Sequence, residues 1–300
     1  MQHQNRNFAA RRVLRRAYAK INLYLDILGC REDGFHELFT VMHALSLHDG
    51  IALTYTPSVT RSISLRVFGA HLPTDSRNLA YRAVEAFLDA AGRNAAVTVT
   101  IRKHIPIAAG LAGGSSDAAA VLLACNEAAG YPLTKDALLE LAARLGSDVP
   151  FCLVGGTQIC RGRGEKMTPL TVKEPLYAVV AIGGEHVSTP AAFAATDEYY
   201  NRFDGSVAHG KDETRLCDVL ANGGFAEEDL VYNAFEPVIL PTCPIASSLR
   251  EKLLELGAYS AHMSGSGPSV FGLFHTAEEA KNAARALGKG AWYTQSADVE

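Results

Sequence analysis

A glycine-rich segment that ends in two serines is the part of this sequence best suited to bind phosphate groups. It leads directly into a run of alanines and leucines that predicts a helix. Glycines lack a Cβ, so backbone N–H groups can converge on an anion, and the free N–H groups of a helix N-terminus add partial positive charge. No Gly-Lys-Ser/Thr follows and no GxGxxG is present, so the segment is neither a Walker A loop nor a dinucleotide fingerprint. The alternative is a glycine-rich turn that only caps a helix. The residues of the segment are Pro106, Ile107, Ala108, Ala109, Gly110, Leu111, Ala112, Gly113, Gly114, Ser115 and Ser116.

Two further segments contain residues suited to phosphoryl transfer to an alcohol. Lys20 and Asn22 lie on the polar face of a stretch whose alternation begins near Val13 and predicts a strand. Asp148 follows a predicted helix, in a tight Gly-Ser-Asp-Val-Pro segment. A positioned carboxylate that accepts the proton of an alcohol typically contributes about 10²–10⁴-fold. On residue chemistry alone, a solvated strand lysine and a turn aspartate remain the alternatives.

Four segments, in order, resemble a known kinase superfamily. Residues 106–118 are similar to the phosphate loop of the kinases named after galactokinase, homoserine kinase, mevalonate kinase and phosphomevalonate kinase. The segments AKINL with REDGFH (residues 19–36), GSDVPF (residues 146–151) and SGSGPSVF (residues 264–271) resemble one branch, the 4-diphosphocytidyl-2-C-methyl-D-erythritol kinases. Together the four segments span nearly the whole chain. The chain departs from many relatives at Tyr18, where they have proline, and at Phe35, where they often have tyrosine.

The resemblance implies an ATP-dependent transferase. It implies transfer of the γ-phosphate, with Mg²⁺ accompanying the nucleotide, to the 2-hydroxyl of 4-diphosphocytidyl-2-C-methyl-D-erythritol in the non-mevalonate route to isoprenoid precursors. Asp148 would accept the hydroxyl proton, and Lys20 would stabilise the carboxylate and the developing alkoxide. We interpret the Ser264–Gly267 loop as backing the phosphate loop. A larger side chain at Gly110 or Gly113 is expected to exclude the phosphates.

The resemblance also implies the residues that select the substrates. His36 would read the edge of the cytosine while Phe35 lies on its face, assisted by Phe193. On chemistry alone, Phe35 and His36 are an aromatic pair beside a turn, a position where packing is the commoner role. The remaining implied contacts are Asn22 and Thr189 for the substrate and Asn78 for the adenine, although Asn78 also suits a helix cap.

The elements that must position these residues alternate irregularly. Helices are predicted over residues 78–91, from Ser115 to Gly130 and from Thr134 to Leu145, and a hairpin is predicted over Phe151–Cys160. Without a regular βαβ order, an α+β protein is the better prediction. We expect a two-domain kinase fold with domains at residues 1–165 and 176–300, separated at the Pro-bounded stretch 168–175. The resemblance implies an active-site cleft between them.

Composition restricts the remaining classes. Hydrophobic residues make up 48% of the 300 residues and charged residues 20%, as in a packed globular protein. The cysteines show no CxxC pair or zinc-like spacing, no run approaches the roughly 18 apolar residues of a membrane helix, and the N-terminus lacks a signal-peptide core. These features predict a cytoplasmic protein with no membrane partner and no metal held by a ligand motif. A small-molecule substrate, and Mg²⁺ bound with the nucleotide, are what the resemblance implies. We expect a monomer or a weak homodimer.

Charge is unevenly distributed along the chain. The net charge is −4, but residues 1–25 carry six cations and no acid, which leaves −10 for the rest. We interpret this basic arm as a tail leading into the first strand; a targeting remnant and an anion-binding arm stay open. The acidic remainder disfavours nucleic-acid binding. The nearest rivals are a sister kinase for homoserine or a mevalonate-type alcohol and, from another class, an RNA-binding module of the same fold.

Overall fold

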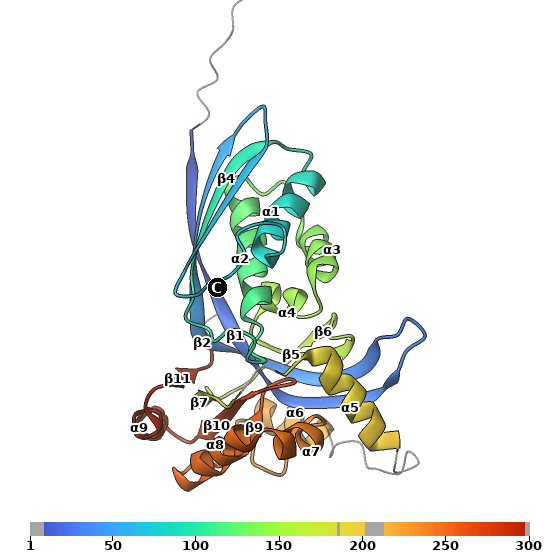
Figure 1. Ribbon diagram of the computed structural model, residues 1–300, viewed down its shortest axis with the longest axis vertical. Helices are drawn as coiled ribbons and strands as arrows, with labels where there is room; N and C mark the ends of the chain where they lie inside the picture. Colours follow the sequence, from blue (N-terminus) through green and yellow to red (C-terminus); the bar gives the residue numbers. More distant parts are fainter. Residues whose placement is uncertain (1–8, 185–186, 202–212, 298–300) are drawn as a thin grey trace, which may run out of the picture. The chain divides into compact units, whose positions relative to one another are not determined.

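The chain opens with two long strands, β1 (Arg11–Cys30) and β2 (His36–Pro57), joined by a turn in which Gly34 has a φ of 79°. The structure is a computed structural model that describes residues 9–184, 187–201 and 213–297 (Figure 1). The first eight residues of the basic arm lie outside this part, whereas residues 11–17 form the start of β1. The combination of helices with mixed and antiparallel sheets confirms the predicted α+β class.

The other elements follow in chain order. They are β3 (Ser62–Phe68), α1 (Leu79–Ala90), β4 (Ala95–Arg102), α2 (Gly113–Ala128), α3 (Lys135–Leu145), α4 (Val149–Val154), β5 (Thr157–Gly162), β6 (Lys166–Pro169), β7 (Tyr177–Ile182), α5 (Thr189–Asn201), α6 (Glu213–Asn222), β8 (Tyr232–Asn233), α7 (Glu236–Ile239), the 3₁₀ turn η1 (Leu240–Thr242), α8 (Pro244–Glu255), β9 (Ser260–Met263), β10 (Ser269–Phe274), α9 (Ala277–Leu287) and β11 (Ala291–Gln295). No helix of the described ranges has the length and apolar character needed to cross a membrane.

Contacts divide the chain into two compact units that interleave along the sequence. The first unit comprises the chain up to residue 17 together with residues 48–105 and 113–153. The second comprises residues 18–47, residues 106–112 and the chain from residue 154 onward. The two units are therefore not successive stretches, and the boundary at residues 168–175 stays a prediction.

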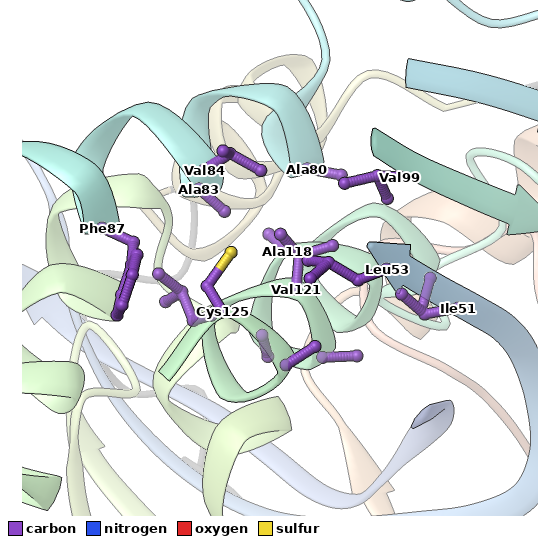
Figure 2. Close-up of a cluster of buried hydrophobic side chains, with 14 of the residues drawn as sticks. Ile51, Leu53, Ala80, Ala83, Val84, Phe87, Val99, Ala118, Val121 and Cys125 are labelled. Atoms are coloured by element: carbon purple, nitrogen blue, oxygen red, sulfur yellow. The ribbon is translucent and has the colours of Figure 1, made fainter. Parts of the chain in front are cut away.

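The first unit packs three helices on a sheet. β3 pairs in parallel with β4, and β4 pairs antiparallel with residues 50–57 of β2. The apolar faces of α1, α2 and α3 form one buried cluster with side chains of these strands. Figure 2 shows Val84 and Phe87 of α1, Val121 and Cys125 of α2, and strand residues such as Leu53 within this cluster. The helices begin at the predicted caps, because Asn78 accepts from the N–H of Ala80 and Thr134 from that of Ala137.

The second unit contains a separate four-stranded antiparallel sheet with the order β11-β7-β10-β9. Residues of α8 and α9 form a buried cluster with its strands. In the same unit, residues 38–43 of β2 pair antiparallel with β5, and β5 pairs with β6. Tyr24 and Leu25 of β1 pair in parallel with β8. This unit therefore fixes the middle of β1, the segment that contains Lys20 and Asn22.

One predicted element is wrong and another begins earlier than predicted. The apolar run before Gly155 is helix α4 rather than the first strand of a hairpin, because a short apolar run has no periodicity that separates strand from helix. Gly155 and Gly156, with φ of 70° and 68°, end this helix and lead into β5. Helix α2 begins at Gly113, two residues before the predicted cap at Ser115, so the last glycines of the segment belong to its first turn.

Candidate active site

The phosphate loop takes a strained path into α2. Ala108 and Ala112 have φ of 53° and 57°, in the left-handed region that residues with a Cβ seldom adopt, and Gly110 has a φ of 76°. Residues held in this region tend to cluster at functional sites. Helix geometry leaves the N–H groups at the very start of α2, at Gly113, Gly114 and Ser115, without a carbonyl partner in the preceding turn. The loop therefore ends on a set of donors suited to an anion.

The Ser264–Gly267 turn backs this loop, as predicted. The Ser264 hydroxyl donates to the carbonyl of Gly110 over 3.1 Å, and the Ser269 hydroxyl donates to the carbonyl of Ala109. A Cβ at Gly110 would lie 2.1 Å from the Ser264 carbonyl oxygen. Gly110 is therefore required by packing between the two segments. We expected Gly110 to leave room for phosphates, but a larger side chain there would first collide with the Ser264 carbonyl.

A buried asparagine that the sequence did not single out holds the turn. Asn233 donates from Nδ2 to the carbonyls of Met263, over 2.8 Å, and Gly265, over 2.9 Å. Its Oδ1 accepts from the N–H of Phe235. The sequence gives one indication of this role: Asn233 is a polar residue within the otherwise largely apolar run 230–235.

Lys20 is buried and its amine is held by a chain of hydrogen bonds. Its side chain is 4% exposed, and Nζ donates to Asn22 Oδ1 over 2.7 Å. Asn22 in turn donates from Nδ2 to the Thr40 hydroxyl over 2.8 Å. The alternative of a solvated lysine is therefore excluded. The strand was predicted correctly, and the structure shows that its polar face is buried at Lys20 and Asn22.

The second unit brings Lys20 to the phosphate loop. The Lys20 N–H donates to the carbonyl of Leu111 over 3.2 Å. A Cβ at Gly265 would lie 3.4 Å from Lys20 Nζ and 3.6 Å from Asn22 Oδ1. An ammonium group, an amide and the loop thus meet at one place. Such a group of fixed donors can stabilise charge that develops on transferred oxygens.

Asp148 belongs to the first unit, directly before α4. Its carbonyl accepts from the N–H of Cys152, and its side chain is partly exposed. The N–H of Val149 donates to the carbonyl of Gly146, which closes the turn between α3 and α4. Asp148 is thus carried between two helix ends in a segment whose path is fixed by backbone hydrogen bonds.

A buried triad of charges lies beside the start of α2 and was missed by the sequence reasoning. Lys103 Nζ donates to Asp49 Oδ2 over 2.5 Å and to Asp117 Oδ2 over 2.7 Å, and all three side chains are at most 4% exposed. Asp49 also accepts from the N–H groups of His104 and Ile105. The triad therefore ties the chain entering the phosphate loop to the helix that leaves it.

Burial perturbs the charges of this triad. It raises the pKa of Asp117 to about 7; Lys103 opposes the change and Asp49 adds to it. Burial by itself would lower the pKa of Lys103, but the two carboxylates outweigh it and leave that pKa raised. Asp117 Oδ1 is buried with no hydrogen-bond partner in the described part of the chain. Lys103 is thus the shared ion-pair partner of two carboxyl groups.

The three residues predicted to bind the base, His36, Phe35 and Phe193, all belong to the second unit, but His36 and Phe35 contact different side chains. The ring of His36 stacks on that of Phe193, with centroids 4.3 Å apart and planes 15° apart, and its Nε2 lies 2.9 Å from Asp197 Oδ1. Phe35 is 49% exposed, and the guanidinium carbon of Arg163 lies 4.6 Å from its ring centroid. Phe193 therefore contacts His36, whereas Phe35 has an arginine on its ring.

Thr189 and Asn78 have structural partners. The Thr189 hydroxyl lies 3.0 Å from that of Ser266, which links the start of α5 to the turn behind the phosphate loop. Asn78 caps α1 through Oδ1 and donates from Nδ2 to the carbonyl of Pro73. The capping role of Asn78 is confirmed; its adenine contact stays a prediction.

Comparisons with known proteins identify the class of fold. The family model described as GHMP kinases N terminal domain matches residues 78–156, and the one described as GHMP kinases C terminal matches residues 220–293. Solved structures of a homoserine kinase from Cytophaga hutchinsonii and a mevalonate kinase from L. major share the fold, with TM-scores of 0.70 and 0.73 at 19% and 16% identity. They cover 99% and 97% of this chain, and it covers 97% of each. These matches define a small-molecule kinase of the GHMP class.

Curated relatives give a narrower result. The 4-diphosphocytidyl-2-C-methyl-D-erythritol kinase of Pelotomaculum thermopropionicum is 42% identical over 89% of this chain and 91% of its own length. That of Gloeobacter violaceus is 42% identical over 86% and 84%. A crystal structure of 4-(cytidine 5'-diphospho)-2C-methyl-D-erythritol kinase matches with a TM-score of 0.79 at 36% identity, over 95% of this chain and all of that one. The chain belongs to the 4-diphosphocytidyl-2-C-methyl-D-erythritol kinase family.

Proposed function

We propose that this chain transfers the γ-phosphate of ATP to the 2-hydroxyl of 4-diphosphocytidyl-2-C-methyl-D-erythritol, a step toward isoprenoid precursors by the non-mevalonate route. The observation that carries the proposal is the placement of the Lys20 ammonium, fixed by Asn22 and Thr40, against the Gly265 turn that backs the phosphate loop. Family membership favours the cytidine substrate over homoserine and mevalonate, whose kinases share only the fold with this chain.

An ADP-release assay with a panel of alcohols tests this function. The purified chain is given ATP with 4-diphosphocytidyl-2-C-methyl-D-erythritol, homoserine or mevalonate in turn, and the phosphorylated product is identified by mass spectrometry. We expect turnover with the cytidine compound alone. Turnover with homoserine or mevalonate instead would assign the chain to a sister kinase.

The proposed chemistry divides among three groups. Asp148 accepts the proton of the attacking hydroxyl as the oxygen–phosphorus bond forms, and ADP leaves as the bond to the β-phosphate oxygen breaks. Lys20 stabilises the negative charge on the reacting oxygens, and Asn22 positions Lys20. The N–H groups at the start of α2 bind the phosphates. Mg²⁺ would neutralise the phosphate charge when bound with the nucleotide, and the partly exposed hydroxyl of Ser115 fits a hard cation of this kind, whereas Ser116 is buried.

Gly114 offers a direct test of the phosphate site. No described atom lies within 4 Å of a Cβ built there, and its φ is not left-handed, so Gly114→Ala is compatible with the fold. If the backbone contacts a phosphate at this point, the added methyl group should raise the Kd for ATP by about 10- to 100-fold through misplacement of the nucleotide. Isothermal titration calorimetry measures this Kd. Gly50→Ala, a second glycine with room for a Cβ, is the matched control. ATP affinity that is unchanged in a folded Gly114→Ala variant would restrict the loop to a structural role.

His36 has a hydrogen-bonding state that suits cytosine. The Asp197 carboxylate accepts hydrogen bonds, so the proton of a neutral His36 ring lies on Nε2 and Nδ1 is left as an acceptor. Cytosine presents an exocyclic amino group, which is a donor. We propose that Nδ1 accepts from this amino group and that Phe35 stacks on the base.

His36→Ala is accordingly expected to raise the KM for the cytidine substrate by about 5- to 150-fold, because a polar edge of the bound base is left unpaired. The KM for ATP should not change. Steady-state kinetics with each substrate varied separately measure both constants. Asp197→Asn, which keeps an acceptor oxygen beside His36, is expected to have a smaller effect. Equal changes in both Michaelis constants would mean that His36 has a packing role and does not contact the base.

The state of the cysteines bears on the cellular compartment of the enzyme. The six cysteines are all free thiols, and Cys30 is exposed. Free thiols are typical of a reducing compartment. We therefore propose a cytoplasmic enzyme. We further propose that it acts on small molecules, as a monomer or a weak homodimer, without a nucleic-acid or membrane partner.

A further inference from the structure

Arg163 lies in the turn between β5 and β6, and its side chain covers the ring of Phe35. The guanidinium carbon is 4.6 Å from the ring centroid, within the distance at which a cation attracts an aromatic face. Phe35 still exposes 49% of its surface. One side of the ring is thus occupied by protein, and a large part of it remains accessible.

Polar contacts tie the turn that carries Arg163 to the turn that carries Phe35. Glu37 accepts from Arg31 Nη1 over 2.7 Å and from the N–H of Gly162 over 3.0 Å. Arg31 lowers the pKa of the Glu37 carboxyl, so this link is ionised at neutral pH. The Phe35 N–H donates to Asp33 Oδ1 over 3.2 Å, and the Arg163 N–H donates to Glu165 Oε2 over 2.6 Å. Hydrogen bonds therefore hold the backbone at both residues, and the guanidinium of Arg163 lies over the Phe35 ring.

We propose that Arg163 is a positioning residue for the nucleobase: its guanidinium holds the Phe35 ring so that the accessible face receives the cytosine. The inference rests on the proposed function, in which Phe35 stacks on that base. An aromatic ring held in its binding orientation loses less conformational freedom when the ligand arrives, and this saving appears as affinity. A planar guanidinium stacks on a ring better than the compact ammonium of lysine does.

The chain contains a matched control for this arrangement. Arg161, two residues earlier, places its guanidinium carbon 4.5 Å from the ring centroid of Phe39. Phe39 is only 2% exposed, so a ligand has no access to that ring. Loss of Arg161 removes an equivalent cation–ring contact without affecting a base.

Steady-state kinetics and calorimetry with cytidine 5'-diphosphate and with cytidine test the proposal. For Arg163→Ala we expect KM for the cytidine substrate and Kd for both probes to rise about 2- to 5-fold, the range of an exposed cation–ring contact. The kcat and the KM for ATP should stay at wild-type values. Arg163→Lys should recover part of the loss, and Arg161→Ala should leave all five constants unchanged.

A double-mutant cycle decides what the arginine acts on. If Arg163 acts through the ring, its removal from a Phe35→Leu background should have no further effect on binding. An effect that persists in that background, or one that is larger for the diphosphate than for cytidine, would mean a charge contact with phosphate and would overturn the proposal. If the wild-type chain neither binds cytidine 5'-diphosphate nor turns over the cytidine substrate, the proposed function itself fails. Binding and turnover without coupling between Arg163 and Phe35 would reject this inference alone.

Discussion

Replacing Asp148 by asparagine is expected to lower turnover by about 10²-fold or more, the usual contribution of a positioned general base. The change preserves the size of the side chain but removes its negative charge and its ability to accept a proton. The path of the segment around Asp148 is fixed by backbone hydrogen bonds at Gly146–Val149 and Asp148–Cys152, which the substitution leaves intact. The Kd for ATP should therefore stay close to its wild-type value.

Single-turnover kinetics at saturating substrates measure this effect without interference from product release. Asp136→Asn is the matched control, because it makes the same chemical change at an exposed aspartate in the first turn of α3. A folded Asp148→Asn variant that retains turnover within threefold of the wild type would remove Asp148 from the reaction.

Lys20→Met extends the same test. If Lys20 and Asp148 act on the same reacting oxygens, the double variant should lose much less than the product of the two single losses, because groups that act as a unit are not additive. Fully multiplicative losses would mean that the two side chains act independently, and would reject the shared role.

Replacing Lys103 by methionine is expected to lower the free energy of unfolding by about 3–5 kcal/mol, the cost of breaking a buried ion pair by removing one partner. Asp49 and Asp117 would be left as buried carboxylates with no cation between them. Urea unfolding followed by circular dichroism measures the change. We also expect weaker ATP binding, because the triad joins the two ends of the phosphate loop.

A second substitution separates charge from packing. Asp117→Asn in the Lys103→Met background removes one of the two buried carboxyl groups left without a cation and should recover part of the lost stability, which a double-mutant cycle measures. Lys135→Met, at an exposed lysine at the start of α3, is the control and should change the stability by less than about 0.5 kcal/mol. A Lys103→Met variant as stable as this control would show that the triad contributes nothing net to the fold.

The sequence predicted the features that depend on neighbouring residues. Caps at Asn78 and Thr134 located two helices, because a capping side chain binds a backbone N–H two or three residues away. The spacing of glycines and serines at residues 106–116 predicted an anion site, and the resemblance of this segment and three others predicted the family that the comparisons confirm. Each of these features is read from a short stretch of chain.

Features that depend on distant residues were not accessible in this way. Alternation at Lys20–Leu28 predicted a strand, but alternation does not report what covers its polar face; that depends on Leu111 and Gly265, which are far away in the sequence. Gly110 was recognised as necessary for the wrong reason, because the carbonyl that excludes a side chain there belongs to Ser264.

The sequence by itself determined the class of enzyme, through the resemblance of four segments to one family, and it located capped helices and a strand, because local geometry and residue type suffice for these. The tertiary structure alone decided that Asn233 holds the turn behind the loop, that one lysine pairs with both Asp49 and Asp117, and that the Arg163 guanidinium lies over the ring of Phe35. The physical reason is that burial and ion pairing depend on distances in space, and these groups are separated by between 14 and 128 residues along the chain.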